Sequence, residues 1–263
     1  MPTRVITVTS GKGGVGKTTT TANLGVALAK LGQRVVVMDT DIGLRNLDVI
    51  MGLQNRIIYD IVDLAEGRAR LRQALIRDRE QDELYLLPAA QTRDKSAISP
   101  ADLVRVCAQL RGECDYVLID SPAGIELGFR NAVAPADEFV LVTTPDESAI
   151  QDVDRVLGIL ESEGRTATSL VVNRTRPDWV KRNDMASPAA IARRLAVPLL
   201  GVVNEFEEVL LANSRGRPVA HDDKGAAGRA YHEMARRLMG EDVPLEPAQA
   251  RRRNLLEWIR GLW

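Results

Sequence analysis

The chain has 263 residues and a formal net charge of −1 at pH 7, with 45% hydrophobic and 27% charged residues. The length suits one large α/β domain or two small ones. The net charge provides no overall electrostatic field that would favour binding to nucleic acid or to an anionic membrane, although a local basic patch could still bind either. Because no secretory signal opens the sequence and no apolar run reaches the ~18 residues of a membrane span, we expect a cytoplasmic protein.

Short apolar runs alternate with helical patterns along most of the chain. The sequence predicts strands over 5–9, 34–39, 84–88, 115–120, 138–144, 168–173 and 199–203. It predicts helices over 17–31, 99–112, 126–134, 147–163, 187–195, 205–213 and 224–239. Several strands are continuous Val, Leu and Ile, which is typical of strands buried on both faces. The order predicts an α/β fold, a doubly wound and mostly parallel sheet with helices on both faces and ligands at the carboxyl ends of the strands.

A phosphate-binding loop follows the first strand. Residues 11–18, GKGGVGKT, match G-x-x-x-x-G-K-[ST] between a predicted strand and a predicted helix, which makes a chance match improbable. Lys17 would contact the β- and γ-phosphates, and the Thr18 hydroxyl would bind Mg²⁺. Backbone N–H groups of the loop and the helix N-terminus favour anions. The residues expected to bind nucleotide here are Gly11, Lys12, Gly13, Gly14, Val15, Gly16, Lys17, Thr18 and Thr19.

Three acidic residues follow predicted strands beside this loop. Asp39 and Asp41 come at the end of the second strand, and Asp120 ends the strand over 115–120. Each alone could be a helix or turn cap. Together beside a phosphate-binding loop they indicate a metal site, in which Asp120 would hold Mg²⁺ through water. Gly124, after a proline, suits a turn that could sense the γ-phosphate.

Lys12 is a second lysine in a loop that needs only one. Taken by itself, this residue would be interpreted as a solvated loop cation.

Four segments carry a resemblance to a known family. KGGVGKTT, DTDIGLRNLDVIMG, LPAAQTRDKSA and DSPAGIE together resemble the deviant Walker A (ParA/MinD) family of P-loop ATPases, and within it the cell-division ATPases that place the septum. The resemblance implies an ATP-dependent homodimer that hydrolyses ATP with Mg²⁺. It also implies a peripheral location on the inner face of the cell membrane, recruitment of a MinC-like division inhibitor and control by a MinE-like or other topological regulator.

The resemblance assigns roles to individual residues. It implies that Lys12 reaches across a dimer interface to the partner's phosphates, where a second cation would stabilise the transferring phosphoryl group as an arginine finger does. It implies that Asp41 positions the attacking water, so that Lys12, Lys17 and Asp41 are catalytic, and that Asp39 supports Mg²⁺ bound by Thr18 and Asp120. It further implies that Asn173 reads adenine, since an amide offers one donor and one acceptor.

Three further positions concern partner and base contacts. Ser148 and Asp152 open a helix near which the family orders its early loop lysine and builds partner-binding surface. Asn204 stands where family members commonly carry proline, in a loop that lies near the adenine of relatives. This departure puts the base contacts in question but should not affect phosphate chemistry.

The end of the chain differs in composition from the rest. We expect an ATPase domain over 1–239, a linker over 240–250 and an amphipathic membrane-targeting helix over 251–263. On a helix, the apolar side chains of this tail fall within an arc of about 160°, and they are Leu255, Leu256, Trp258, Ile259, Leu262 and Trp263. A terminal helix docked on its own domain, or a coiled-coil partner helix, remains open from the pattern alone.

Other functional classes share parts of these features. A ParA-like DNA-segregation ATPase should show a basic patch, but acids offset the arginines of 68–80. A flagellar-number ATPase is not excluded by the tail, and QTRDK counts only modestly against it. An iron–sulfur carrier is disfavoured because Cys107 lies in a predicted helix and Cys114 just before a strand, a poor arrangement for a shared cluster. We expect both to be reduced thiols, and His221 and His232 to be surface or packing residues rather than ligands.

Overall fold

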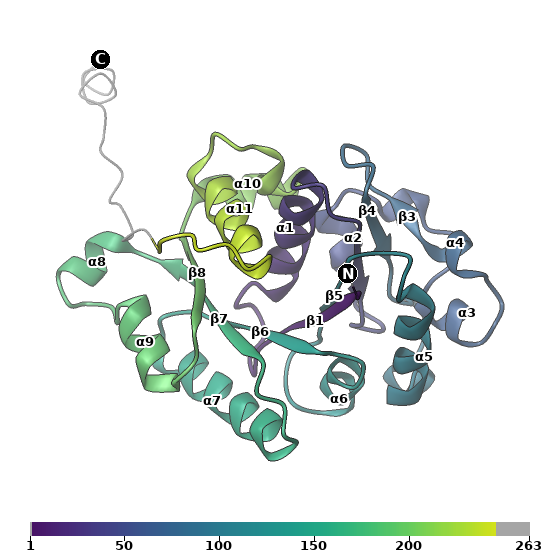
Figure 1. The fold of residues 1–263 in the computed structure, drawn as a ribbon, viewed down its shortest axis with the longest axis horizontal. Coiled ribbons are helices and arrows are strands. Elements are labelled where there is room, and N and C mark those ends of the chain that lie inside the picture. Colours follow the sequence, from purple (N-terminus) through teal and green to yellow (C-terminus); the bar gives the residue numbers. More distant parts are fainter. Residues whose placement is uncertain (1, 246–263) are drawn as a thin grey trace.

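A computed structural model describes residues 2–245 of the chain (Figure 1). Its eight-stranded sheet has the order β3-β4-β2-β5-β1-β6-β7-β8, and every pairing is parallel except that of β3 with β4. The strands are β1 (Arg4–Thr9), β2 (Val35–Asp39), β3 (Ile76–Arg77), β4 (Leu84–Leu87), β5 (Tyr116–Asp120), β6 (Glu138–Thr143), β7 (Thr168–Thr175) and β8 (Leu199–Asn204). The predicted fold class is therefore confirmed. The predicted tail helix lies outside the described residues.

Helices cover both faces of the sheet. They are α1 (Lys17–Lys30), α2 (Leu47–Ile50), α3 (Ile61–Ala65), α4 (Leu71–Ala74), α5 (Pro100–Leu110), α6 (Leu127–Val133), α7 (Glu147–Ser162), α8 (Pro177–Lys181), α9 (Pro188–Leu195), α10 (Glu207–Ser214) and α11 (Ala226–Leu238). Figure 1 shows α1, α10 and α11 on one side and α5, α6, α7 and α9 on the other. Leu24 and Leu28 of α1 and Met234 of α11 are buried with Val37 and Leu118 of the sheet. On the opposite face, α5 covers β2, β4 and β5, and α7 and α9 cover β6 and β7.

The long predicted elements are confirmed to within one or two residues, but the short ones were missed. Sequence analysis did not predict β3, α2, α3, α4 or α8, each of two to five residues. So short an element shows no apolar periodicity. Tertiary contacts position it instead, as when two backbone amides at the start of α2 donate to the carboxylate of Asp39.

The last two strands depart from regular pairing. In the ladder between β7 and β8, Val172 pairs with Val202 and Thr175 pairs with Asn204. Two residues of β7, Asn173 and Arg174, therefore lie opposite one residue of β8, which is a β-bulge. The strand runs two residues past its predicted end because pairing resumes after the bulge.

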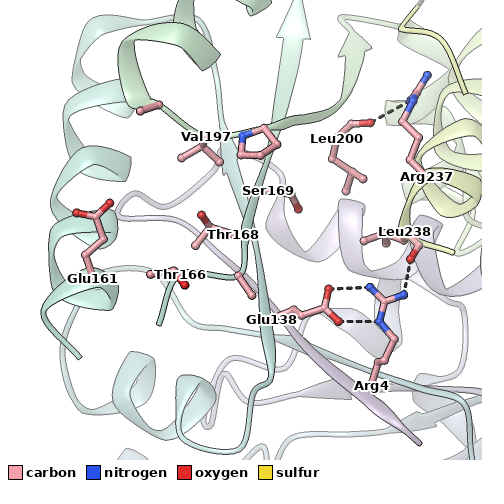
Figure 2. A pocket seen from close by; sticks show the side chains of 13 residues that line it. Arg4, Glu138, Glu161, Thr166, Thr168, Ser169, Val197, Leu200, Arg237 and Leu238 are labelled. Carbon is pink, nitrogen blue, oxygen red and sulfur yellow. Dashed lines mark hydrogen bonds and ion pairs between the residues drawn. The ribbon is translucent and has the colours of Figure 1, made fainter. Parts of the chain in front are cut away.

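A cavity of about 400 Å³ lies at the amino-terminal edge of the sheet, opposite the phosphate-binding loop (Figure 2). Arg4, the first residue of β1, forms a bidentate ion pair with Glu138, the first residue of β6, with N–O distances of 2.6 and 2.7 Å. Arg4 also donates to the carbonyl of Leu238 at the end of α11. None of the predicted nucleotide or metal residues lines this cavity, because they lie at the carboxyl edge of the sheet.

The cysteines and histidines have structural surroundings. Cys107 and Cys114 are free and buried, and burial raises the pKa of each thiol to about 12. His221 packs with Asp78 and Glu80 of the β3–β4 turn, and burial lowers its pKa. Within residues 2–245, no helix combines the length and the apolar character that a bilayer crossing requires.

Candidate nucleotide-binding site

The predicted phosphate-binding loop connects β1 to α1 and depends on its glycines. Gly14 and Gly16 have φ of 78° and 103°, in the left-handed region that other residues adopt only with strain. A Cβ on Gly16 would lie 2.3 Å from Nδ2 of Asn173, so a side chain could not fit there. A Cβ on Gly11 would lie 2.4 Å from the backbone oxygen of Asp152 in α7. The loop is thus packed between β7 and α7 without room for side chains at either contact.

Lys17 points inward. It is only 6% exposed, and its Nζ donates to Oγ of Ser10 at 3.0 Å and to the carbonyl oxygen of Lys12 at 3.1 Å. Burial lowers the pKa of Lys17, while the charges of Asp120 and Asp41 act in the opposite direction. The predicted phosphate lysine is therefore buried beside the predicted metal acids. Ser10 is not among the predicted site residues, although its place directly after β1 is a signal in the sequence.

Lys12 points away from the loop toward α7. Its Nζ donates to Oγ of Ser148 at 2.6 Å and lies 3.3 Å from Oδ1 of Asp146, and its side chain is 43% exposed. Ser148 thus lies where the family resemblance placed it. The Asp152 side chain instead pairs with Arg155 at 3.5 Å. The two lysines of one loop are directed to different places.

Asp146 is the residue that sequence analysis missed at this contact. It caps the N-terminus of α7, where its carboxylate accepts from the amide of Ala149 at 3.0 Å and from Oγ of Ser148 at 2.8 Å. It also accepts from the hydroxyl of Thr144. Burial opposes ionisation, but the hydrogen bonds from Thr144, Ser148, Ala149 and Lys12 outweigh it and hold the pKa of Asp146 well below its ordinary value. The carboxylate that meets Lys12 is therefore an anion at neutral pH.

Asp39 and Asp120 are direct neighbours on β2 and β5 and are almost fully buried. The carboxylate of Asp39 accepts from the backbone amides of Asp41 at 2.9 Å and of Asn46 and Leu47 at 3.1 Å each. Burial raises the pKa of Asp39 to about 6, although these amides favour the charged form. One predicted metal residue therefore also fixes the loop that follows β2.

Asp120 lies against the start of α1. Burial, followed by the charge of Asp39, raises its pKa well above the ordinary value, and a hydrogen bond from the Thr18 side chain and the charge of Lys17 oppose this rise. Thr21 donates to Oδ1 of Asp120 at a long 3.4 Å. The structure therefore brings Thr18, Asp39 and Asp120 together as predicted. The negative charge of Asp41 contributes to raising the pKa of Lys17, Asp39 and Asp120.

This donor set suits Mg²⁺. Within the described part of the chain, no group of three or more His, Cys, Asp or Glu side chains could hold a metal by itself. Mg²⁺ commonly takes one or two carboxylates and completes its shell with water and substrate phosphates. Asp39 and Asp120 are neighbouring buried carboxylates whose pKa values are raised. A divalent cation bound between them would favour their ionised forms.

Asn173 connects β7 to the phosphate-binding loop. Its Nδ2 donates to the carbonyl oxygen of Val15 at 2.8 Å, and its Oδ1 accepts from the amide of Arg174 at 2.9 Å. The structure gives Asn173 a role in holding the loop, and its reading of adenine stays a prediction. Thr19 accepts a hydrogen bond from Nδ2 of Asn213 in α10 at 3.1 Å, a contact that no local sequence signal indicated.

Comparisons with known proteins identify the family of this chain. Residues 6–219 match the model of the CobQ/CobB/MinD/ParA nucleotide binding domain. The septum site-determining protein MinD of Bacillus subtilis is 50% identical over 260 residues, which cover 98% of this chain and 97% of that protein. This chain belongs to the MinD family. As a MinD-family protein it is an ATPase of the P-loop class, as the loop and its acids predicted.

Two solved MinD structures share the fold over nearly the whole described chain. The MinC:MinD cell division protein complex of Aquifex aeolicus gives a TM-score of 0.84 at 46% identity, covering 92% of this chain and 98% of that one. The septum site-determining protein MinD of Pyrococcus horikoshii, complexed with Mg-ADP, gives 0.81 at 29% identity, covering 92% and 100%.

Replacing Asp39 by asparagine should remove a pH dependence of stability. The folded chain keeps the Asp39 proton up to a pKa of about 6, whereas the ordinary value is 3.8. Stability is therefore lost as the pH rises through this window, by up to about 3 kcal/mol. In nucleotide-free, chelated protein, the unfolding free energy of wild type minus that of Asp39→Asn should decrease between pH 4 and pH 7. A difference that is constant or increases with pH would contradict the burial of an ionisable Asp39.

Proposed function

We propose that this MinD-family ATPase is an ATP-dependent membrane switch that helps to place the division septum. It dimerises with ATP, binds the inner face of the cell membrane and recruits a MinC-like division inhibitor. A MinE-like or other topological regulator would stimulate hydrolysis. The observation that carries the proposal is the different orientation of Lys17 and Lys12, because the first is buried within the loop and the second reaches the exposed cap of α7.

ATP and Mg²⁺ would occupy the carboxyl edge of the sheet. Lys17 and the loop amides would bind the β- and γ-phosphates, while Thr18 and Asp120 would hold Mg²⁺ with support from Asp39. Mg²⁺ supplies charge neutralisation to the phosphates when bound. The MinD of P. horikoshii, similar in fold over 92% of this chain, is a Mg-ADP complex, which supports this assignment.

Hydrolysis would require both subunits. Asp41, which follows β2 beside Asp39, would position the attacking water. Lys12 would leave Ser148 and Asp146 and contact the phosphates bound to the partner subunit, supplying a second cation as an arginine finger does. Its hydrogen bond to Ser148 and ion pair to Asp146 are half-exposed, so breaking them costs little. ATP-driven dimerisation would thereby be tied to turnover.

Lys12→Ala should separate nucleotide binding from turnover. The pocket-facing Lys17 uses the carbonyl of Lys12 and not its side chain, so ATP affinity should stay near wild type. Dimerisation should be lost and turnover should fall by about 10³-fold, the lower range for a residue acting like an arginine finger. Equilibrium binding, sedimentation and phosphate release measure the three quantities. Lys17→Ala is the control and should lose productive phosphate binding. Wild-type turnover in Lys12→Ala would exclude the role in trans.

The membrane part of the proposal concerns the end of the chain. We keep the division into an ATPase domain over 1–239, a linker over 240–250 and a membrane-targeting helix over 251–263, the last of which lies outside the described residues. Arg237 donates to the carbonyls of Val243 at 2.8 Å and Pro244 at 2.6 Å, so the first linker residues are fixed to the domain. One short helix binds a bilayer weakly, whereas two on one dimer act together.

Removing residues 251–263 should abolish ATP-dependent sedimentation with anionic vesicles while leaving the ATP-driven dimer intact. Trp258→Glu should act similarly, because it places a charge in the apolar arc. Arg253→Glu should weaken binding less, and most at low salt, because its contribution is electrostatic.

Tryptophan emission tests the same helix directly. Trp179 of α8 would add background, so Trp179→Phe isolates Trp258 and Trp263. Vesicles with ATP should shift their emission to the blue. An unshifted spectrum, together with unchanged sedimentation after truncation, would exclude the tail as the anchor.

The DNA-segregation alternative finds no support in the arginine-rich stretch over 68–80. Arg68 pairs with Asp63 at 2.8 Å and Arg77 contacts Asp82, so these arginines are in part neutralised by neighbouring acids. The MinC:MinD structure of A. aeolicus, 46% identical to this chain, favours the septum assignment.

A further inference from the structure

The helix α11 ends in a turn that sends the chain back along the helix. Gly240 has φ of 90°, and its amide donates to the carbonyl of Arg237 at 2.9 Å, while the amide of Glu241 donates to the carbonyl of Arg236 at 3.0 Å. These two bonds form a Schellman motif, which by itself ends a helix and satisfies carbonyls of its last turn. The helix therefore needs no contact beyond Glu241 in order to end.

The side chain of Arg237 nevertheless fixes the residues that follow. It is only 11% exposed. Its Nε donates to the carbonyl of Val243 at 2.8 Å and its Nη2 to the carbonyl of Pro244 at 2.6 Å. Nη1 donates to the carbonyl of Leu200 in β8 at 3.0 Å, and Nη2 also donates to Glu233 at 3.2 Å. One guanidinium can hold these four acceptors because its donors lie in one rigid plane.

Burial contributes little to the position of this segment. Glu241, Asp242, Pro244 and Leu245 are exposed, and Val243 is half-buried. Exposed carbonyls can bond to water, so the bonds from Arg237 are not needed to satisfy them. What these bonds add is a fixed position for residues 243–244. We call Arg237 and the carbonyls of Leu200, Val243 and Pro244 the linker clamp.

The clamp is built on a rigid part of the domain. Tyr231 and Met234 of α11 are fully buried, and Arg4 of β1 donates to the carbonyl of Leu238. Figure 2 shows Arg237 bonded to Leu200 beside the cavity at the amino-terminal edge of the sheet. The start of the linker is therefore held at the edge of the sheet opposite the phosphate-binding loop.

This position suits the proposed dimer. Lys12, which would cross to the partner subunit, lies in the loop at the carboxyl edge. A chain that leaves the domain from the amino-terminal edge does not pass through that surface. In the proposed division, six residues, 245–250, separate Pro244 from the helix over 251–263. Without the clamp the fixed chain would end at Glu241, and nine residues, 242–250, would separate the two.

From these contacts we propose that Arg237 shortens the linker and thereby strengthens the binding of the dimer's two helices to one membrane. Once one helix is bound, the effective concentration of the second falls roughly as the −3/2 power of linker length, and lengthening from six to nine residues lowers it about twofold. The inference rests on the proposed membrane switch. It assigns a positioning role to a residue outside both the nucleotide site and the tail.

Two unrelated changes should have the same effect. Arg237→Met removes the donors of the clamp but keeps most of the side-chain volume. Inserting Ala-Gln-Ala after residue 250, a copy of 248–250, lengthens the linker by three residues with the clamp intact. Each should raise about twofold the dissociation constant for vesicles of equal parts phosphatidylglycerol and phosphatidylcholine with ATP, measured by sedimentation. With ADP, where one helix acts alone, neither should change it.

A deletion provides the rescue. Removing residues 246–248 from Arg237→Met brings the separation back to six residues and should restore the wild-type dissociation constant with ATP. A residue that only stabilises the fold would not be rescued in this way. Arg229→Met is the matched control, since Arg229 lies on the same helix and donates to the carbonyl of Lys224 instead, and it should bind vesicles as the wild type does.

The other outcomes would overturn the proposal. Wild-type affinity in Arg237→Met beside a loss in the insertion variant would show that the clamp does not set the linker length. Wild-type affinity in both variants would show that linker length does not matter, and a loss that the deletion does not rescue would assign Arg237 to the fold alone. Tighter binding in either variant would mean that the clamp holds the helices back from a common bilayer.

A spin label on Leu245→Cys reads the clamp without a membrane. Buried Cys107 and Cys114, whose pKa is raised to about 12, should not compete for the label. The label should become more mobile in Arg237→Met, and unchanged mobility would overturn the clamp itself. Failure of the wild-type protein to bind vesicles more tightly with ATP than with ADP would instead contradict the proposed function.

Discussion

The backbone carbonyl of Lys12 is the point on which the arrangement of this site depends. It accepts hydrogen bonds from Nζ of Lys17 at 3.1 Å and from Oγ of Ser10 at 2.7 Å, which hold Lys17 inside the loop. The Lys12 side chain is then directed outward, where Ser148 and Asp146 of the α7 cap receive it. The backbone of Lys12 thus holds Lys17 in position, while the charged end of its own side chain lies at the surface. The proposed role of Lys12 at a second subunit would use this division.

Buried charge couples this loop to the rest of the carboxyl edge. Lys17 is nearly inaccessible beside Asp120, and Asp120 is the register neighbour of Asp39. The burial of Lys17 lowers its pKa, while the burial of Asp39 and Asp120 raises theirs, so each group resists ionisation until opposite charge is supplied. Phosphates and Mg²⁺ supply both signs. Because Asp39 also accepts from the amides of Asn46 and Leu47, the same carboxylate joins this centre to the loop before α2.

Sequence patterns predicted the parts of the site that are local. The phosphate-binding loop, Asp39 and Asp120 follow long buried strands whose ends can be located from composition alone. Asp146 and Asn213 could not be found in this way, since each meets the loop from more than 100 residues away and resembles an ordinary cap or helix residue. The bulge at Asn173 and Arg174 depends on the register of β7 against β8, and a strand whose middle is buried on both faces has no alternation that would indicate this register. The predicted tail is amphipathic by pattern, and the lipid surface that we propose as its partner is not specified by the fold of the domain.

Mixing two inactive variants tests most directly whether Lys12 completes the partner's site. Lys12→Ala and Asp41→Ala should each hydrolyse ATP slowly when alone. In a mixed dimer, the nucleotide bound by the Lys12→Ala subunit meets its own Asp41 and the Lys12 of the Asp41→Ala partner, so one of two sites is complete. With one variant tagged so that the fraction of mixed dimers is measured, turnover per mixed dimer should reach up to about half that of the wild-type dimer, since one of its two sites is complete. If Lys12 acted on the nucleotide of its own subunit, no site would be complete, and the mixture would stay as slow as either variant.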